Sequence, residues 1–168
     1  MLKSHEILGF MSPNLALEIL TYAYDSDKQL YKTTLAAVAE SRKVRAVFLE
    51  RQPRAQRHAG MLASLSRPSL DMITGNLIRG WLLKKYNGML VSFLDALGLP
   101  HKEGVVENLP ETMDEAKLRT AVDGLLATYP QEVVGVYLNA FCEMNEVDWP
   151  SLKTMLESEP RLQLGAAA

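Results

Sequence analysis

The sequence of 168 residues contains a single cysteine, Cys142. One cysteine excludes an internal disulfide framework and cysteine-rich zinc modules, and it is typical of proteins from a reducing compartment. Long apolar runs are also missing, because the most apolar window, 89–99, contains Asp95 and falls well short of the roughly 18 residues of a membrane span. Polar residues interrupt the apolar stretch within residues 1–11, which argues against a secretory signal. We therefore expect a cytoplasmic protein without a membrane segment.

Patterns that hold metals, nucleotides or catalytic groups are missing as well. No histidine has a glutamate three residues before it, so the Glu-x-x-His units of di-iron bundles are absent. The glycines between residues 75 and 88 lie within or between helical segments with no preceding strand, which excludes a phosphate-binding glycine loop. Glutamates flank Cys142 and disfavour its thiolate, so we expect it to be a small buried side chain. The sequence thus predicts no catalytic residue, no metal and no cofactor.

The pattern that is present is helical. Apolar residues recur three and four positions apart along nearly the whole chain, which predicts an all-α fold. Ser26 with Gln29, and Thr112 with Glu115, match the capping box that starts a helix. We predict a compact bundle of about seven or eight helices that forms a single domain over residues 1–165. The predicted helices begin near residues 13, 26, 53, 66, 89, 112, 130 and 150, the run 44–49 is expected to form a helical turn, and 166–168 (Ala-Ala-Ala) are interpreted as a tail left from expression.

Two segments of the chain resemble two later segments at nearly the same offset. Residues 82–86 (LLKKY) resemble 125–129 (LLATY) at an offset of 43, and 93–97 (FLDAL) resemble 137–141 (YLNAF) at an offset of 44. A period of this size is typical of helical-hairpin repeats, which often form partner-binding scaffolds. Amphipathic helices are built from few residue types, so matches of this quality also arise by chance. A solenoid needs at least three repeats. We favour a bundle, and the echo leaves open a duplicated helical hairpin within it.

Charge is distributed unevenly, although 18 Lys and Arg against 20 Asp and Glu give a net charge of only −2. Residues 1–41 carry a net charge of −2, residues 42–86 carry +8 and residues 87–168 carry −8. The near-neutral sum therefore conceals a basic middle segment and an acidic second half. Either the two segments neutralise each other inside the fold or across a dimer, or they face different partners. We favour neutralisation.

The basic residues of segment 42–58 form the main candidate site. In the helix that begins at Pro53, Arg54 and Arg57 lie opposite a stripe of alanine and leucine side chains, so we expect them to be exposed. Guanidinium groups bind two oxygens of a phosphate or carboxylate at once. The stripe expected to be buried is Ala55, Ala59, Leu62 and Leu65, and the face expected to be exposed is Arg54, Arg57, His58 and Met61. The candidate residues for binding an anion or a partner are Arg42, Arg45, Arg51, Arg54, Arg57 and His58.

A second candidate site lies in the longest irregular stretch, residues 98–111. His101, Lys102 and Glu103 are gathered there between two glycines, and long loops often carry function. Three polar residues on a surface turn are nevertheless ordinary, and no serine or cysteine nucleophile accompanies them. We therefore disfavour catalysis at this loop.

Three functions follow in order of preference. The first is a non-enzymatic helical interaction module, or a small accessory protein, that binds a protein partner or a second copy of itself. The second is a nucleic-acid or phosphate binder that uses segment 42–58. Phe48 is the only aromatic residue in that segment, so a stacking platform for single-stranded nucleic acid is missing. The third is an enzyme or small-ligand binder with a pocket between helices, using His58 or His101.

Overall fold

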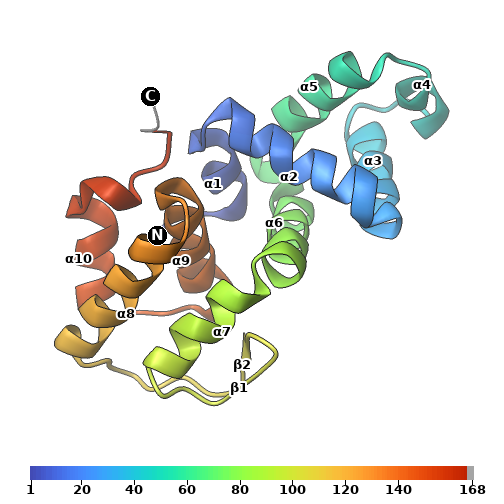
Figure 1. Ribbon diagram of the computed structural model, residues 1–168. Coiled ribbons are helices and arrows are strands. Elements are labelled where there is room, and N and C mark those ends of the chain that lie inside the picture. Colours follow the sequence, from blue (N-terminus) through green and yellow to red (C-terminus); the bar gives the residue numbers. More distant parts are fainter. Residues whose placement is uncertain (166–168) are drawn as a thin grey trace. The chain divides into compact units, whose positions relative to one another are not determined.

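The computed structural model describes residues 1–165 and is all-α, as the sequence predicts (Figure 1). Ten α-helices lie within these residues, slightly more than the seven or eight predicted. The additional helix is Ser4–Phe10, and the predicted helical turn in 44–49 is a short helix of its own. Among the same residues no helix is both long enough and apolar enough to cross a membrane. The tail predicted at 166–168 lies outside the described residues.

The chain divides into two compact units. The N-terminal unit covers Leu2–Trp81 and the C-terminal unit begins at Leu82, so the division falls inside α6 (Asp71–Lys85). A single domain over residues 1–165 stays a prediction. The N-terminal unit also contains α1 (Ser4–Phe10), α2 (Pro13–Ser26), α3 (Lys28–Ser41), α4 (Ala46–Glu50), α5 (Arg54–Leu65) and the 3₁₀ helix η1 (Pro68–Leu70). The C-terminal unit also contains α7 (Asn87–Ala96), β1 (His101–Lys102), β2 (Val105–Val106), α8 (Glu115–Thr128), α9 (Gln131–Asn145), α10 (Pro150–Ser158) and the 3₁₀ helix η2 (Pro160–Leu162).

In the N-terminal unit, α2, α3 and α5 pack on one another, and α4 packs on α3 and α5. Two glycines of α6 allow neighbouring helices to approach it closely. A Cβ at Gly75 would lie 2.9 Å from Ser4 Oγ, and one at Gly80 would lie 2.7 Å from Leu30 Cδ2. These glycines therefore let α1 and α3 pack against the helix.

Asp71 fixes the start of α1 to the start of α6. Its Oδ1 accepts a hydrogen bond from the His5 backbone N–H at 2.9 Å and lies 2.7 Å from His5 Nδ1. Burial alone would raise the pKa of Asp71, but the two hydrogen bonds from His5 hold it below its ordinary value. The carboxylate thus supplies a partner for one of the free N–H groups at the start of α1.

Helix ends differ in detail from the sequence prediction. Asp27 caps α3 and Asp114 caps α8, each accepting a hydrogen bond from the backbone N–H three residues on, at 3.3 and 2.9 Å. The predicted caps Ser26 and Thr112 were therefore wrong by one and two residues. The aspartates occupy the cap positions because a carboxylate accepts a stronger hydrogen bond than a hydroxyl does. Its negative charge is also stabilised by the positive end of the helix dipole.

Lys43 ends α3 in the left-handed region, with φ of 57°. The Lys43 N–H binds the carbonyl of Glu40, and the Val44 N–H binds the carbonyl of Ala39, both at 3.0 Å. This is the Schellman arrangement, in which glycine usually occupies the left-handed position. The turn reverses the chain and sends it into α4.

The C-terminal unit is built around α7, α8 and α9. The repeated segments of the sequence fall at corresponding places in the helices. Residues 82–86 and 125–129 lie at the C-terminal ends of α6 and α8. Residues 93–97 lie at the C-terminal end of α7, and 137–141 lie within α9. Corresponding aromatic rings meet edge to face, with centroids 6.2 Å apart for Tyr86 with Tyr129 and 5.5 Å apart for Phe93 with Tyr137. These contacts agree with a duplicated hairpin, which stays a prediction.

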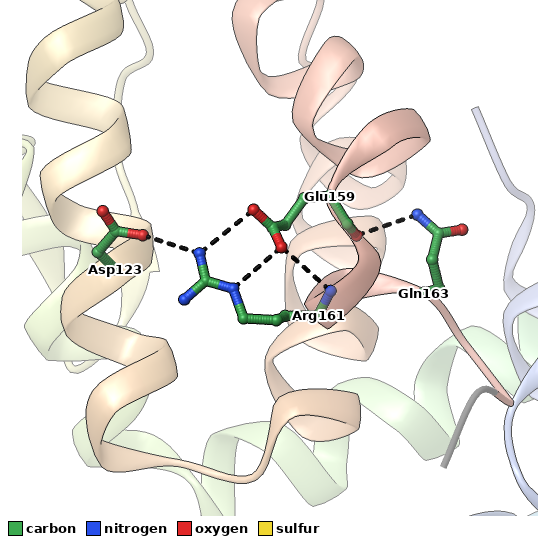
Figure 2. A network of polar contacts seen from close by, with 4 residues as sticks. All are labelled: Asp123, Glu159, Arg161 and Gln163. Atoms are coloured by element: carbon green, nitrogen blue, oxygen red, sulfur yellow. Dashed lines mark hydrogen bonds and ion pairs between the residues drawn. The ribbon is translucent and has the colours of Figure 1, made fainter. Parts of the chain in front are cut away.

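The chain after α10 folds back along α9, where Arg161 and its neighbours hold it (Figure 2). The Arg161 guanidinium donates to Glu159 Oε1 at 2.9 Å and to Asp123 Oδ1 of α8 at 3.3 Å. Gln163 Nε2 donates to the Glu159 carbonyl at 3.2 Å. These groups are largely exposed, so they orient the segment more than they stabilise it. The tight packing lies underneath, where a Cβ at Gly135 would sit 2.4 Å from the Leu162 carbonyl oxygen.

Two alanine substitutions test this packing. Gly124, in α8, has no atom within 4 Å of a would-be Cβ, so Gly124→Ala gains helix propensity and should stabilise the protein by about 0.5–1 kcal/mol. Gly135→Ala gains the same propensity but collides with backbone, so it should destabilise by about 1–3 kcal/mol. Urea unfolding followed by circular dichroism measures both. Equal effects of the two variants would contradict the close approach of η2 to α9.

Candidate functional site

The six candidate residues of segment 42–58 fall into two groups of three. Arg42, Arg57 and His58 form hydrogen bonds within the N-terminal unit, whereas Arg45, Arg51 and Arg54 extend into solvent. The segment runs from the turn that follows α3, through α4, into the first residues of α5 (Figure 1).

Arg57 connects three helices through its guanidinium group. Its Nε donates to the Tyr31 hydroxyl of α3 at 2.9 Å. Its Nη1 donates to the carbonyls of Glu50 and Gln52, at 3.1 and 3.3 Å, at the C-terminal end of α4. The last carbonyls of a helix have no partner within the helix itself. Arg57 therefore completes the end of a helix of only five residues and attaches it to α3 and α5.

His58 lies behind Arg57 and is buried, with 2% of its surface exposed. Its Nε2 lies 2.9 Å from the Tyr31 hydroxyl oxygen. Since that oxygen already accepts from Arg57, the hydroxyl proton is available to a neutral imidazole, which is a better acceptor than the Met61 sulfur at 3.8 Å. Burial lowers the pKa of His58 to about 4, and the charges of Arg57 and Arg54 act in the same direction. Burial raises the pKa of Tyr31, against the opposing effect of Arg57.

The orientation predicted for α5 was wrong in part: Leu65 is buried and Arg54 is exposed as predicted, but other positions differ. His58 and Met61 are buried, whereas Ala55 and Ala59 are exposed. Methionine and imidazole side chains remove more surface from water than alanine methyl groups do. The Tyr31 hydroxyl also supplies the hydrogen-bond partner that a buried imidazole needs. His58 is therefore removed from the candidate binding surface.

Arg42 bonds inward as well, to α5. Its Nε donates to Ser64 Oγ at 3.0 Å, and its Nη2 donates to the Gly60 carbonyl. Arg54 keeps an exposed side chain, with its guanidinium 5.3 Å from the centre of the Tyr24 ring. Such cation–π contacts orient the group without neutralising its charge.

The outer face of α4 carries two large apolar side chains beside two cations. Phe48 is 57% exposed and Val47 is 45% exposed, while Leu49 anchors the helix from its opposite side. Arg45 directly precedes α4 and Arg51 directly follows it, and both side chains are exposed. We call Arg45, Val47, Phe48 and Arg51 the α4 surface. Among residues 1–165, neither of these arginines forms an ion pair.

The second candidate site proves to be a small hairpin in the C-terminal unit. β1 and β2 are antiparallel, with His101 opposite Val106, and are joined at Glu103 and Gly104, which have φ of 52° and 88°. His101 Nδ1 accepts from the Gly104 N–H at 3.2 Å, so its Nε2 donates to Asp95 Oδ1 at 2.7 Å. Both ring nitrogens are therefore occupied in holding the hairpin to the end of α7. Lys102 and Glu103 are exposed.

A cavity of about 500 Å³ lies beside this hairpin. Asn87 at the start of α7 closes one side and donates to the Glu103 carbonyl at 2.6 Å. Val105 is 40% exposed. The apolar lining comes from Leu83, Val105 and Val106, and the charged lining from Lys102, Glu103 and Glu107. We call this the hairpin cavity. The sequence indicates the polar loop but not the cavity, because strands of two residues are too short to show an alternating pattern.

Other chemically reactive groups are few. Burial raises the pKa of Cys142 to about 11, so its thiol is neutral at ordinary pH. Within residues 1–165 no three side chains of the His, Cys, Asp and Glu types are grouped so that they could hold a metal ion.

Replacing the arginines tests their division into two groups. Arg57→Gln removes the hydrogen bonds to Tyr31 and to the end of α4, so it should lower the free energy of unfolding by about 1–3 kcal/mol. Arg51→Gln removes the same charge from a free side chain and should change it by less than about 0.5 kcal/mol. Equilibrium urea unfolding measures both values. A similar loss in the two variants would show that Arg57 is not a structural link.

The burial of His58 predicts a pH dependence of stability. Its pKa is about 4 when folded and 6.5 in the unfolded chain, so between these values the unfolded state binds the additional proton. The contribution of neutral His58 is complete above pH 6.5 and is lost as the pH falls towards 4. The wild type should lose about 2 kcal/mol more than His58→Gln over this range. Urea unfolding at several pH values tests this, and parallel curves for the two proteins would refute it.

Comparisons with protein-family models, with curated proteins and with solved structures give no match to this chain. What the chain does is therefore inferred from its own residues. The α4 surface and the hairpin cavity each present apolar and charged side chains together.

Proposed function

We propose that this chain is a non-enzymatic interaction module that binds a protein partner through the α4 surface. The observation that carries the proposal is the exposure of Phe48 and Val47 between two arginines with no acidic partner in residues 1–165. Buried interface centres are enriched in aromatic and arginine side chains. Burying Phe48 and Val47 against a partner adds favourable free energy at about 25 cal/mol per Å².

The attachment of α4 supports this assignment. Leu49 and the hydrogen bonds from Arg57 hold the helix from its inner side, so its outer face is presented in a defined orientation. A preorganised surface loses little conformational entropy when it binds. The arginines favour an acidic partner, because opposite charges steer association and select against basic surfaces.

The groups that could serve catalysis are engaged elsewhere, which supports a non-enzymatic role. His58 is buried with a pKa of about 4, and the hydroxyl beside it belongs to a tyrosine whose pKa is raised. His101 uses both ring nitrogens to hold the hairpin. The Cys142 thiol is neutral. A general base or nucleophile needs a free and suitably poised group, which none of these provides.

Binding of nucleic acid or phosphate through segment 42–58 is the alternative. Arg45, Arg51 and Arg54 extend into solvent and favour it, but Arg42 and Arg57 already bond to protein oxygens. The apolar centre of the α4 surface is better matched by a protein.

The test compares three versions of the full chain as immobilised bait in extract from the native host. One is the wild type, one carries Val47→Asp with Phe48→Asp, and the control carries Phe10→Asp, which changes a side chain of similar exposure (58%) on α1. A captured protein is then purified, and its affinity for each version is measured by calorimetry. We expect the α4 double variant to weaken binding at least tenfold, about 1.4 kcal/mol, and the control to bind like the wild type.

Two results would contradict the proposal. Equal binding by all three versions would show that the α4 surface is not used. Capture of nucleic acid, with affinity that falls steeply as salt rises, would favour the phosphate-binding alternative instead.

A further inference from the structure

We infer that the α4 surface binds the hairpin cavity of a second copy of this chain. The inference rests on the proposed function and names the partner of the same surface. The chain carries both halves of the contact: an exposed apolar helix face with flanking arginines, and an open apolar cavity with flanking glutamates.

The charges of the two units are complementary. The N-terminal unit has eleven Lys and Arg against seven Asp and Glu, a net charge of +4. From Leu82 to the end of the sequence there are seven Lys and Arg against thirteen Asp and Glu, a net charge of −6. Two copies are therefore attracted when the N-terminal unit of one approaches the C-terminal unit of the other.

The hairpin cavity has the size and lining to receive an aromatic side chain. Its volume of about 500 Å³ is within the range of ligand-binding clefts, and these are lined mainly by apolar groups. Leu83, Val105 and Val106 supply the apolar lining. Phe48 is the most exposed apolar side chain of α4, so it is the group that enters.

The flanking charges are opposite in sign, and their separations along the chain are of similar size. Arg45 and Arg51 are six residues apart, which places them about 9 Å apart along a helix. Glu103 and Glu107 lie on either side of Val105, up to about 13 Å apart along the hairpin. In the part of the chain that the structure describes, none of these four side chains forms an ion pair. Lys102 is the cation in the lining, and the two glutamates outweigh it.

The contact joins two different surfaces, so each copy carries both halves. Two copies related by a two-fold axis form it twice in a closed dimer, and without closure it propagates into longer assemblies. Either arrangement is larger than the 18.7 kDa chain and dissociates on dilution and in high salt.

Sedimentation velocity over about a hundredfold range of concentration, in low and high salt, tests the inference. We expect the wild type and the Phe10→Asp control to associate in low salt. Phe48→Asp should weaken association at least tenfold. Two charge-reversed variants, Arg45→Glu with Arg51→Glu and Glu103→Lys with Glu107→Lys, should each stay monomeric alone, because like charges then face each other. Mixed in equal amounts they should associate, since the mixture restores both contacts.

A wild type that stays monomeric at all concentrations in low salt would overturn the inference. So would association that survives Phe48→Asp, or two reversed variants that fail to associate when mixed. These failures are distinct from failure of the proposed function, because capture of another protein through Phe48 and Val47 would leave that function standing while the second copy is excluded as the partner.

Discussion

The guanidinium group of Arg57 decides what the N-terminal unit presents to solvent. α4 has five residues, too few to be stable by itself, and its last carbonyls need donors from outside the helix. Arg57 supplies those donors from its Nη1 and donates from its Nε to the Tyr31 hydroxyl. The orientation of Phe48 therefore depends on a residue nine positions further along the chain and in another helix.

The hydrogen bonds of Arg57 and Arg42 reduce the number of cations that segment 42–58 can offer to a partner. The sum of +8 over residues 42–86 describes how many cations are present, but not which are accessible. Arg42 and Arg57 have bonded to carbonyl and hydroxyl oxygens, while Arg45 and Arg51 remain exposed next to apolar side chains. A surface of that composition is better suited to an acidic protein than to a phosphate backbone, because its centre is apolar.

Periodicity in the sequence was sufficient for the fold class and for most of the longer helices. It was not sufficient for the whole face that α5 buries, since the Tyr31 hydroxyl that receives His58 comes from another helix. Gly98 has the left-handed conformation for which glycine is the usual marker at a helix end, but Lys43 and Glu146 adopt it without that marker. Three of the six candidate residues proved to be bonded within the protein for the same reason. The sequence shows which residues are charged, but tertiary packing decides which groups they contact.

The central claim is that Arg57 holds α4 in place and so fixes the α4 surface. Amide hydrogen exchange of α4 and the two residues after it tests this claim most directly, because it measures how readily this short segment opens locally. In Arg57→Gln these amides should exchange at least about tenfold faster than in the wild type, while Arg51→Gln leaves them unchanged. Equal exchange in all three proteins would contradict the account.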